Sequence, residues 1–137
     1  MLDRLRRERA IDGSRVYATG HSNGGGFTYL LWSRRGDALA AAAPSAAAAR
    51  GGLSPKPVIH LAGRRDQLVK FMWQEETIRA LRRRNGTSEG TPWARDCTLY
   101  PSEGGTPVVT HFHEGAHEFP REAPPLIVRF FREHRRK

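Results

Sequence analysis

The residues with the clearest chemical potential are Gly20-His21-Ser22-Asn23-Gly24, which match the G-x-S-x-G pattern of a nucleophile elbow. In an elbow the serine occupies a tight turn between a strand and a helix, where glycines are needed because neighbouring side chains would clash. The turn places the serine hydroxyl above the edge of the sheet. The backbone N–H of Asn23, at the helix start, then points to where an oxyanion would form, so Asn23 is the candidate oxyanion-hole residue.

A serine hydroxyl is a poor nucleophile without a base, and in this arrangement an acid and then a histidine follow the serine along the chain. Asp66 follows the predicted strand 57–62 directly, at the carboxyl end where the acid is expected. Asp37 and Asp96 each precede a predicted strand and therefore lie at the wrong end of the sheet. We predict Asp66 as the acid, with a turn or helix-capping aspartate as the alternative.

The base is predicted to be His117, which lies in a loop after the last predicted strand and before the last predicted helix. The other five histidines lie inside the elbow, within a strand or on the last helix: His21, His60, His111, His113 and His134. His111, His113 and His117 could instead hold a metal, since residues i and i+2 share a strand face. No supporting cysteine or carboxylate cluster accompanies them, so we predict no metal and no cofactor.

The hydrophobic pattern places these residues on strands that alternate with helices. Strands are predicted at 15–19, 38–43, 57–62, 97–100 and 107–112, the last two as a hairpin. Helices are predicted at 2–9, directly after Gly26, at 71–84 and at 123–134. This alternation predicts a single α/β domain over residues 1–137, with a mostly parallel sheet of about four to five strands flanked by helices.

Composition limits the partners and the compartment. The formal charge is +9, yet no aromatic–basic or helix-turn-helix signature appears, so we expect no specific nucleic-acid partner. The single cysteine excludes an internal disulfide. No apolar run approaches the roughly 20 residues that span a bilayer, and the charged N-terminus lacks an apolar signal core. We expect a soluble protein without a membrane partner, with the cytoplasm slightly favoured.

Three segments together resemble the polyhydroxybutyrate depolymerase and feruloyl esterase family of α/β-hydrolases. They are 12–26 around the elbow, His60-Leu-Ala-Gly-Arg-Arg-Asp66, and Gly115-Ala-His117-Glu-Phe-Pro120. The resemblance implies a Ser22, Asp66 and His117 triad in a serine carboxylesterase that acts on short-chain acyl or aryl esters or polyesters. His21, Trp73 and Trp93 are the predicted substrate-binding residues. Phe27 is a further candidate for the pocket, and core packing is the alternative for all three aromatic side chains.

The chain departs from that family in two ways. Ala116 and Phe119 stand where the family usually has glycine and tryptophan. The chain also begins in the helix just ahead of the elbow strand, so we expect a minimal or N-terminally truncated α/β-hydrolase. The part before it normally supplies a second oxyanion-hole N–H, whose loss costs about 10²–10³ in rate. We therefore expect reduced rather than abolished activity.

Truncation also predicts how the chain associates. The strand 15–19 would lie at a sheet edge with unpaired backbone groups, and helix faces would be uncovered. We therefore expect a homodimer or larger homo-oligomer. The alternative function is a catalytically weak relic or basic binding module that keeps the hydrolase fold.

Overall fold

A computed structural model describes residues 1–137 and contains one six-stranded sheet, in the order β1-β2-β3-β6-β5-β4. The strands are β1 (Tyr17–His21), β2 (Ala41–Ser45), β3 (Val58–Gly63), β4 (Thr91–Ala94), β5 (Cys97–Tyr100) and β6 (Val108–His113). The pairs β1–β2, β2–β3 and β3–β6 are parallel, whereas β6–β5 and β5–β4 are antiparallel. The predicted α/β class, the largely parallel sheet and the hairpin are confirmed, with one strand more than expected.

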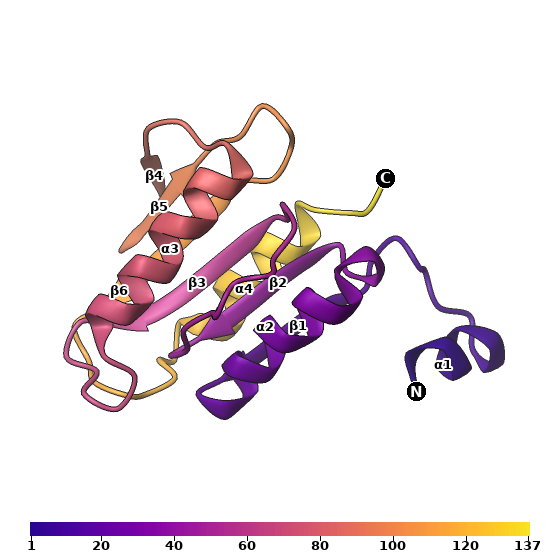
Figure 1. Ribbon diagram of the computed structural model, residues 1–137, viewed down its shortest axis with the longest axis horizontal. Coiled ribbons are helices and arrows are strands. Elements are labelled where there is room, and N and C mark those ends of the chain that lie inside the picture. Colours follow the sequence, from indigo (N-terminus) through magenta and orange to yellow (C-terminus); the bar gives the residue numbers. More distant parts are fainter.

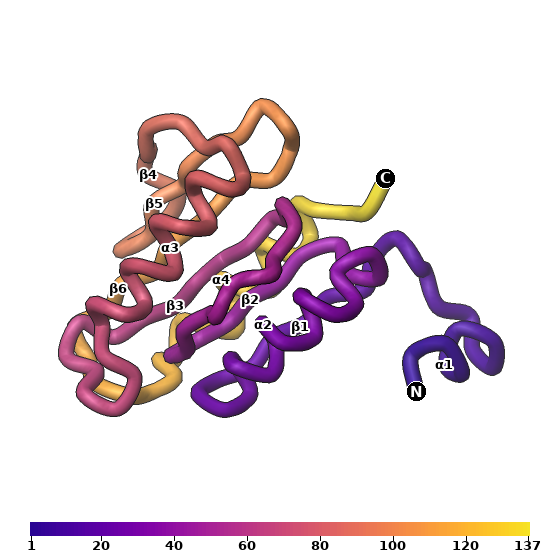
Figure 2. Tube along the Cα trace, viewed as in Figure 1, coloured from indigo at the N-terminus to yellow at the C-terminus, as the bar shows by residue number.

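Helices cover both faces of this sheet. They are α1 (Leu2–Glu8), α2 (Asn23–Arg35), α3 (Phe71–Asn85) and α4 (Ala123–Arg132), with a short 3-10 helix, η1, at Gly36–Ala38. α2 and α3 pack on one face and α4 on the other, while α1 projects from the N-terminal end and buries no residue (Figure 1 and Figure 2). No helix has the length and apolar character that crossing a bilayer requires.

The core divides into two layers because successive side chains of a strand point to opposite faces. Ala42 and Val58 join Tyr29, Trp32 and the apolar side chains of α3 on one face. On the other face the neighbouring strand residues pack under α4, in a cluster that includes Ala41, Ala43, Ile59, Ile127 and Phe130. Strands buried on both faces are expected of a parallel sheet that helices cover on both sides.

Several element boundaries differ from the prediction. β1 and β2 begin two and three residues later than the predicted strands 15–19 and 38–43, and β1 runs on through Gly20 and His21 because they pair with Pro44 and Ser45. β4 escaped prediction because Pro92 lies within it. An outermost strand tolerates proline, since a proline there leaves no ladder hydrogen bond unmade.

The parallel strands bring three chain segments together at the carboxyl ends of the strands. β1, β3 and β6 all end on this side of the sheet, where they are followed by the turn of the elbow, the loop 64–70 and the loop 114–122. Ligands of open α/β sheets bind outside the carboxyl ends of the strands. β1 is also the first strand of the sheet, so its outer backbone groups have no neighbouring strand.

Candidate active site

Ser22 occupies the sharp turn that joins β1 to α2. Its backbone has φ 58° and ψ −115°, a strained conformation for a residue with a Cβ. A Cβ on Gly20 would lie 2.3 Å from the backbone of Gly24, and one on Gly25 would lie 2.5 Å from the carbonyl oxygen of Ser45. Glycine at 20 and 25 is therefore required by packing. The helix begins at Asn23 and not after Gly26 as predicted, so the turn is tighter than the sequence indicated.

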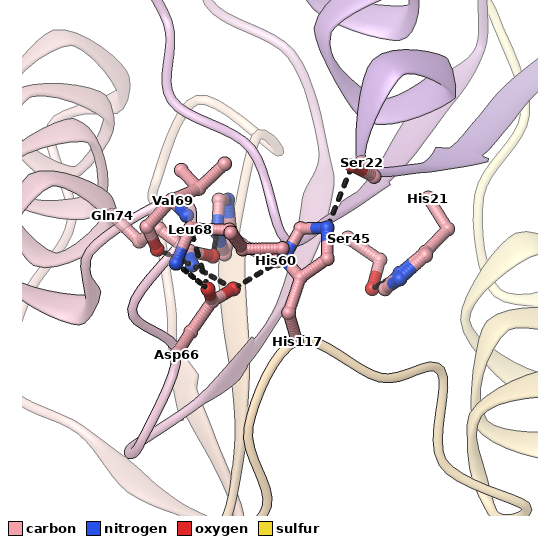
Figure 3. A network of polar contacts seen from close by, with 9 residues as sticks. All are labelled: His21, Ser22, Ser45, His60, Asp66, Leu68, Val69, Gln74 and His117. Atoms are coloured by element: carbon pink, nitrogen blue, oxygen red, sulfur yellow. Dashed lines mark hydrogen bonds and ion pairs between the residues drawn. The ribbon is translucent and has the colours of Figure 1, made fainter.

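The structure brings the three predicted catalytic side chains together (Figure 3). The Ser22 Oγ lies 2.7 Å from His117 Nε2, and His117 Nδ1 lies 2.8 Å from Asp66 Oδ2. Ser22 follows β1, Asp66 lies in the loop after β3 and His117 lies in the loop after β6. These distances allow the Ser22 hydroxyl to donate to Nε2 while Nδ1–H donates to the carboxylate, as a general base requires.

Asp66 is buried, and each of its oxygens has hydrogen-bond donors. Oδ1 accepts the backbone N–H groups of Leu68 and Val69 at 2.9 and 3.0 Å. Oδ2 accepts from His117 and, at 3.3 Å, from the side-chain amide of Gln74. A buried carboxylate needs such donors to remain charged, and here they also fix its orientation toward the imidazole.

A second histidine extends this network into the core. The Oε1 atom of Gln74 lies 3.0 Å from His60 Nε2, and the Tyr29 hydroxyl lies 2.6 Å from His60 Nδ1. Burial lowers the pKa of His60 to about 4, against the opposing effect of its hydrogen bond to Gln74, and burial raises the pKa of Tyr29. His60 is therefore neutral at pH 7. Its Nε2–H donates to Gln74 and its Nδ1 accepts from Tyr29.

A cavity of about 550 Å³ opens beside Ser22. Its walls include Asn23, Tyr29, Leu30 and Trp73, which come from α2 and α3. A volume of this size accommodates a small organic molecule. The backbone N–H of Asn23 is the first in α2 and has no acceptor within the helix, so it is available to a ligand oxygen beside Ser22.

The predicted substrate-binding residues separate in the structure. Trp73 lines the cavity, but Trp93 does not, which corrects its assignment as a pocket residue. Trp93 lies on β4, where its ring packs edge-on against Phe130 and under the guanidinium of Arg129. Phe27 is exposed on α2 and does not line the cavity either.

His21 lies beside the base and outside the cavity. Its ring centroid is 5.2 Å from that of His117 and 5.7 Å from that of Phe119, and its Nδ1 lies 3.0 Å from the Ser45 hydroxyl. Burial lowers the pKa of His21, and the neighbouring His117 adds to that effect. The structure therefore places His21 against the base, whereas the sequence indicated the substrate.

The three histidines that suggested a metal have separate partners. His111 contacts Cys97 and Glu122, and His113 accepts the backbone N–H of Gly115. No group of three or more histidine, cysteine or carboxylate side chains is arranged to hold a metal ion.

Gln74 was the functional candidate that sequence reasoning missed. It occupies the apolar face of α3 together with Ile78 and Leu81, and it is fully buried. A polar residue on an apolar helix face, eight positions after the predicted acid, was the available signal. Buried polar groups require partners, and here the partners are the Val69 carbonyl, His60 and the acid.

Comparison with known proteins gives the fold class. No family model matches the chain. Over 86 residues, 60% of this chain, it is 33% identical to the bifunctional acetylxylan esterase/xylanase XynS20E of Neocallimastix patriciarum. The solved acetyl xylan esterase from Aspergillus awamori matches with a TM-score of 0.73 at 13% identity, over 95% of this chain and 64% of that one. The Bacillus cereus carboxylesterase matches with a TM-score of 0.70 at 20% identity, over 96% and 56%.

These structures are esterases of the α/β-hydrolase type, and the present chain shares their fold over nearly its whole length. The chain spans 13% of the length of the bifunctional enzyme and less than two thirds of each solved structure. Membership of the polyhydroxybutyrate depolymerase and feruloyl esterase family stays a prediction.

Proposed function

We propose that this chain is a serine carboxylesterase that hydrolyses short-chain acyl or aryl esters through an acyl-enzyme intermediate. The observation that carries the proposal is the hydrogen-bonded series from Ser22 through His117 to Asp66 beside a cavity. The fold shared with solved esterases and the partial identity to an acetylxylan esterase/xylanase support the same reaction class.

The geometry suits a two-step acyl transfer. The Ser22 Oγ attacks the ester carbonyl carbon as its proton passes to His117 Nε2, and Asp66 stabilises the imidazolium that forms. The carbonyl oxygen becomes an oxyanion that the Asn23 N–H can bind. When the C–O bond to the alcohol breaks, His117 returns the proton to the departing oxygen. A water molecule then attacks the acyl-enzyme with His117 as base, which releases the acid and restores the Ser22 hydroxyl.

Turnover of 4-nitrophenyl acetate and butyrate by the purified chain tests this function. Wild type should release 4-nitrophenol, and Ser22→Ala should lose nearly all of that activity because no nucleophile remains. Ser54→Ala is a matched control, since it removes a serine hydroxyl from an exposed position outside the cavity. Equal rates in wild type and Ser22→Ala would refute the esterase proposal.

We also propose that the chain self-associates through the sheet edge formed by β1. The outer backbone groups of β1 have no neighbouring strand, and Phe27 and Leu30 expose apolar surface on the adjacent α2. Light scattering at micromolar concentration should give a mass of at least two chains. A monomeric mass would refute the association.

A further inference from the structure

The cavity beside Ser22 extends along α2 as a groove. Its lining residues from this segment include Ser22, Gly26, Tyr29, Leu30 and Ser33, which recur on one side of the helix. The first and the last lie eleven positions apart, a rise of about 16 Å at 1.5 Å per residue. The nucleophile therefore lies at one end of an elongated site.

The segment 46–52 forms the opposite wall and runs in the same direction as α2. A Cβ on Gly25 would lie 2.8 Å from the Cβ of Ala47, near the start of the helix. A Cβ on Gly52 would lie 3.9 Å from the Cβ of Ser33, about two turns later in the helix. Arg50 falls between these two anchor points, toward the end of the groove away from Ser22.

Arg50 differs in charge from everything around it. It is the only charged residue among the twelve that line the groove. It belongs to no ion pair in the structure, so no acidic side chain competes for its guanidinium. Leu30, Val69 and Trp73 supply apolar wall in the same groove. The groove thus presents a nucleophile, an apolar wall and an unpaired cation.

We propose that the groove selects esters whose bound half ends in an anionic group, a carboxylate above all, which Arg50 binds. This inference rests on the esterase function proposed above and adds a substrate class to it. Arginine suits this role because its guanidinium binds a carboxylate with two parallel hydrogen bonds.

Paired substrates of equal chain length test the anion subsite. The kcat/KM for mono-4-nitrophenyl suberate is divided by that for 4-nitrophenyl octanoate, so that only the terminal carboxylate differs. An exposed charge pair predicts that Arg50→Ala lowers this ratio about threefold to fivefold, and Arg50→Glu lowers it further. Arg79→Ala, which removes the same charge outside the groove, should keep the wild-type ratio. A ratio that Arg50→Ala leaves unchanged would exclude the acyl half of the substrate from the subsite.

A second pair of esters identifies which half of the substrate occupies the groove. In 8-acetoxyoctanoate the carboxylate belongs to the alcohol half, and octyl acetate is its neutral control. A dependence on Arg50 in either pair supports the subsite, and a dependence in neither overturns it. The binding of suberate and octanoate to Ser22→Ala, measured by calorimetry, tests the anion subsite separately from the proposed esterase activity. Binding of suberate that requires Arg50 supports the subsite even if no ester is hydrolysed.

A separate observation concerns the buried series Tyr29–His60–Gln74–Asp66. Each hydrogen bond in it has one possible direction: Tyr29 donates to His60, His60 to Gln74, and Gln74 to Asp66. Tyr29 also lines the groove, so the series begins and ends at the proposed site. We infer that Gln74 and His60 are positioning residues, which hold Asp66 Oδ2 toward His117 and share its negative charge.

Gln74→Met tests this role because it keeps the side-chain length and removes the amide. Asp66, with one donor fewer, should hold a proton on His117 more strongly, so the acidic limb of the kcat/KM profile should move to higher pH. We expect kcat to fall about tenfold with KM unchanged, as loss of one hydrogen bond to a charged group predicts. The other titratable groups near Asp66 and His117 are His21, His60 and His113.

A merely structural role for Gln74 predicts a different result. In that case the fraction of active protein, measured by titration of the acyl-enzyme burst, would account for all lost activity, and the pH profile would not move. His60→Gln provides a second variant, which should show a shift of the same sign. An unmoved acidic limb in both variants would overturn the positioning role.

Discussion

The chain contains two sets of nucleophile, histidine and acid, and their burial is reversed. In the first, Asp66 is fully buried while the His117 side chain remains 17% exposed. In the second, Cys97 Sγ lies 3.3 Å from His111 Nδ1, and His111 Nε2 lies 3.2 Å from Glu122 Oε1. There the thiol and the imidazole are buried, and the carboxylate is half-exposed.

This reversal changes the chemistry that each set supports. Burial raises the pKa of the Cys97 thiol to about 11, and the charge of Asp96 adds to the increase, so the reactive thiolate is scarce at pH 7. Ser22 instead faces a groove that a substrate can enter. A nucleophile, a histidine and an acid in hydrogen-bond contact do not by themselves make a catalytic site. The nucleophile must be accessible to substrate, and the acid must be buried and held by hydrogen bonds.

Exchanging each acid for its amide would test the comparison most strongly. Asp66→Asn should reduce kcat by about 10⁴, because an asparagine amide would face His117 Nδ1–H with a donor and favour the wrong tautomer. Glu122→Gln, the matched change in the second set, should leave kcat within about twofold. Steady-state kinetics with 4-nitrophenyl butyrate measures both. Comparable losses in the two variants would break the distinction between the sets.

The buried hydrogen-bond series behind Asp66 also predicts a pH dependence of stability. The pKa of His60 is lowered from 6.5 to about 4, so the unfolded chain binds a proton that the folded chain rejects between these values. Above pH 6.5 His60 is neutral in both states and the free energy of unfolding keeps its full value. As the pH falls from 6.5 toward 4, that free energy decreases by about 3 kcal/mol.

Urea unfolding of wild type and His60→Gln at pH 7.5 and 4.5 measures this contribution, since the remaining histidines are common to both proteins. The loss of stability on acidification should be smaller in the variant. If that variant does not fold, the imidazole protons of His60 in wild type should show no titration above about pH 5. A midpoint near 6.5 would contradict the buried neutral state.

Substitution of Trp73 and of Trp93 by alanine should affect different properties of the protein. Trp73→Ala removes a groove wall and should change the preference among acyl chain lengths. Trp93→Ala should leave that preference intact and lower the free energy of unfolding by about 1–2 kcal/mol, through lost contact with Phe130 and Arg129. Kinetics with acetate to octanoate esters and urea unfolding separate the effects. An altered preference in Trp93→Ala would contradict its place outside the groove.

The smallest effect is expected at Cys97. Cys97→Ser should retain wild-type esterase activity, and the native thiol should resist iodoacetamide at pH 8 because it is buried and protonated. Mass spectrometry of native and urea-unfolded protein measures the alkylation, with the unfolded sample as control. Rapid alkylation of the folded protein would show that the second nucleophile is accessible.

The sequence predicted the parts of the site that depend on local order along the chain. Ser22, Asp66 and His117 could be found because each follows a strand of a parallel sheet, and such strands end at one edge. The groove and the Tyr29–His60–Gln74 series could not, because they form only when α2 and α3 pack on the same face. Trp93 was misplaced because an aromatic side chain fits a pocket and a core equally well by composition. The antiparallel edge strand that carries it was hidden by Pro92.

Labelling with a fluorophosphonate tests the central claim most directly, because the reagent forms a stable bond only with an activated serine. Intact and peptide mass spectrometry of the wild-type chain should show one adduct, on Ser22. The adduct should be absent from Ser22→Ala, much slower to form in His117→Ala, and unaffected in Cys97→Ser. A folded wild-type protein that takes no label, or takes it at another residue, would contradict the account.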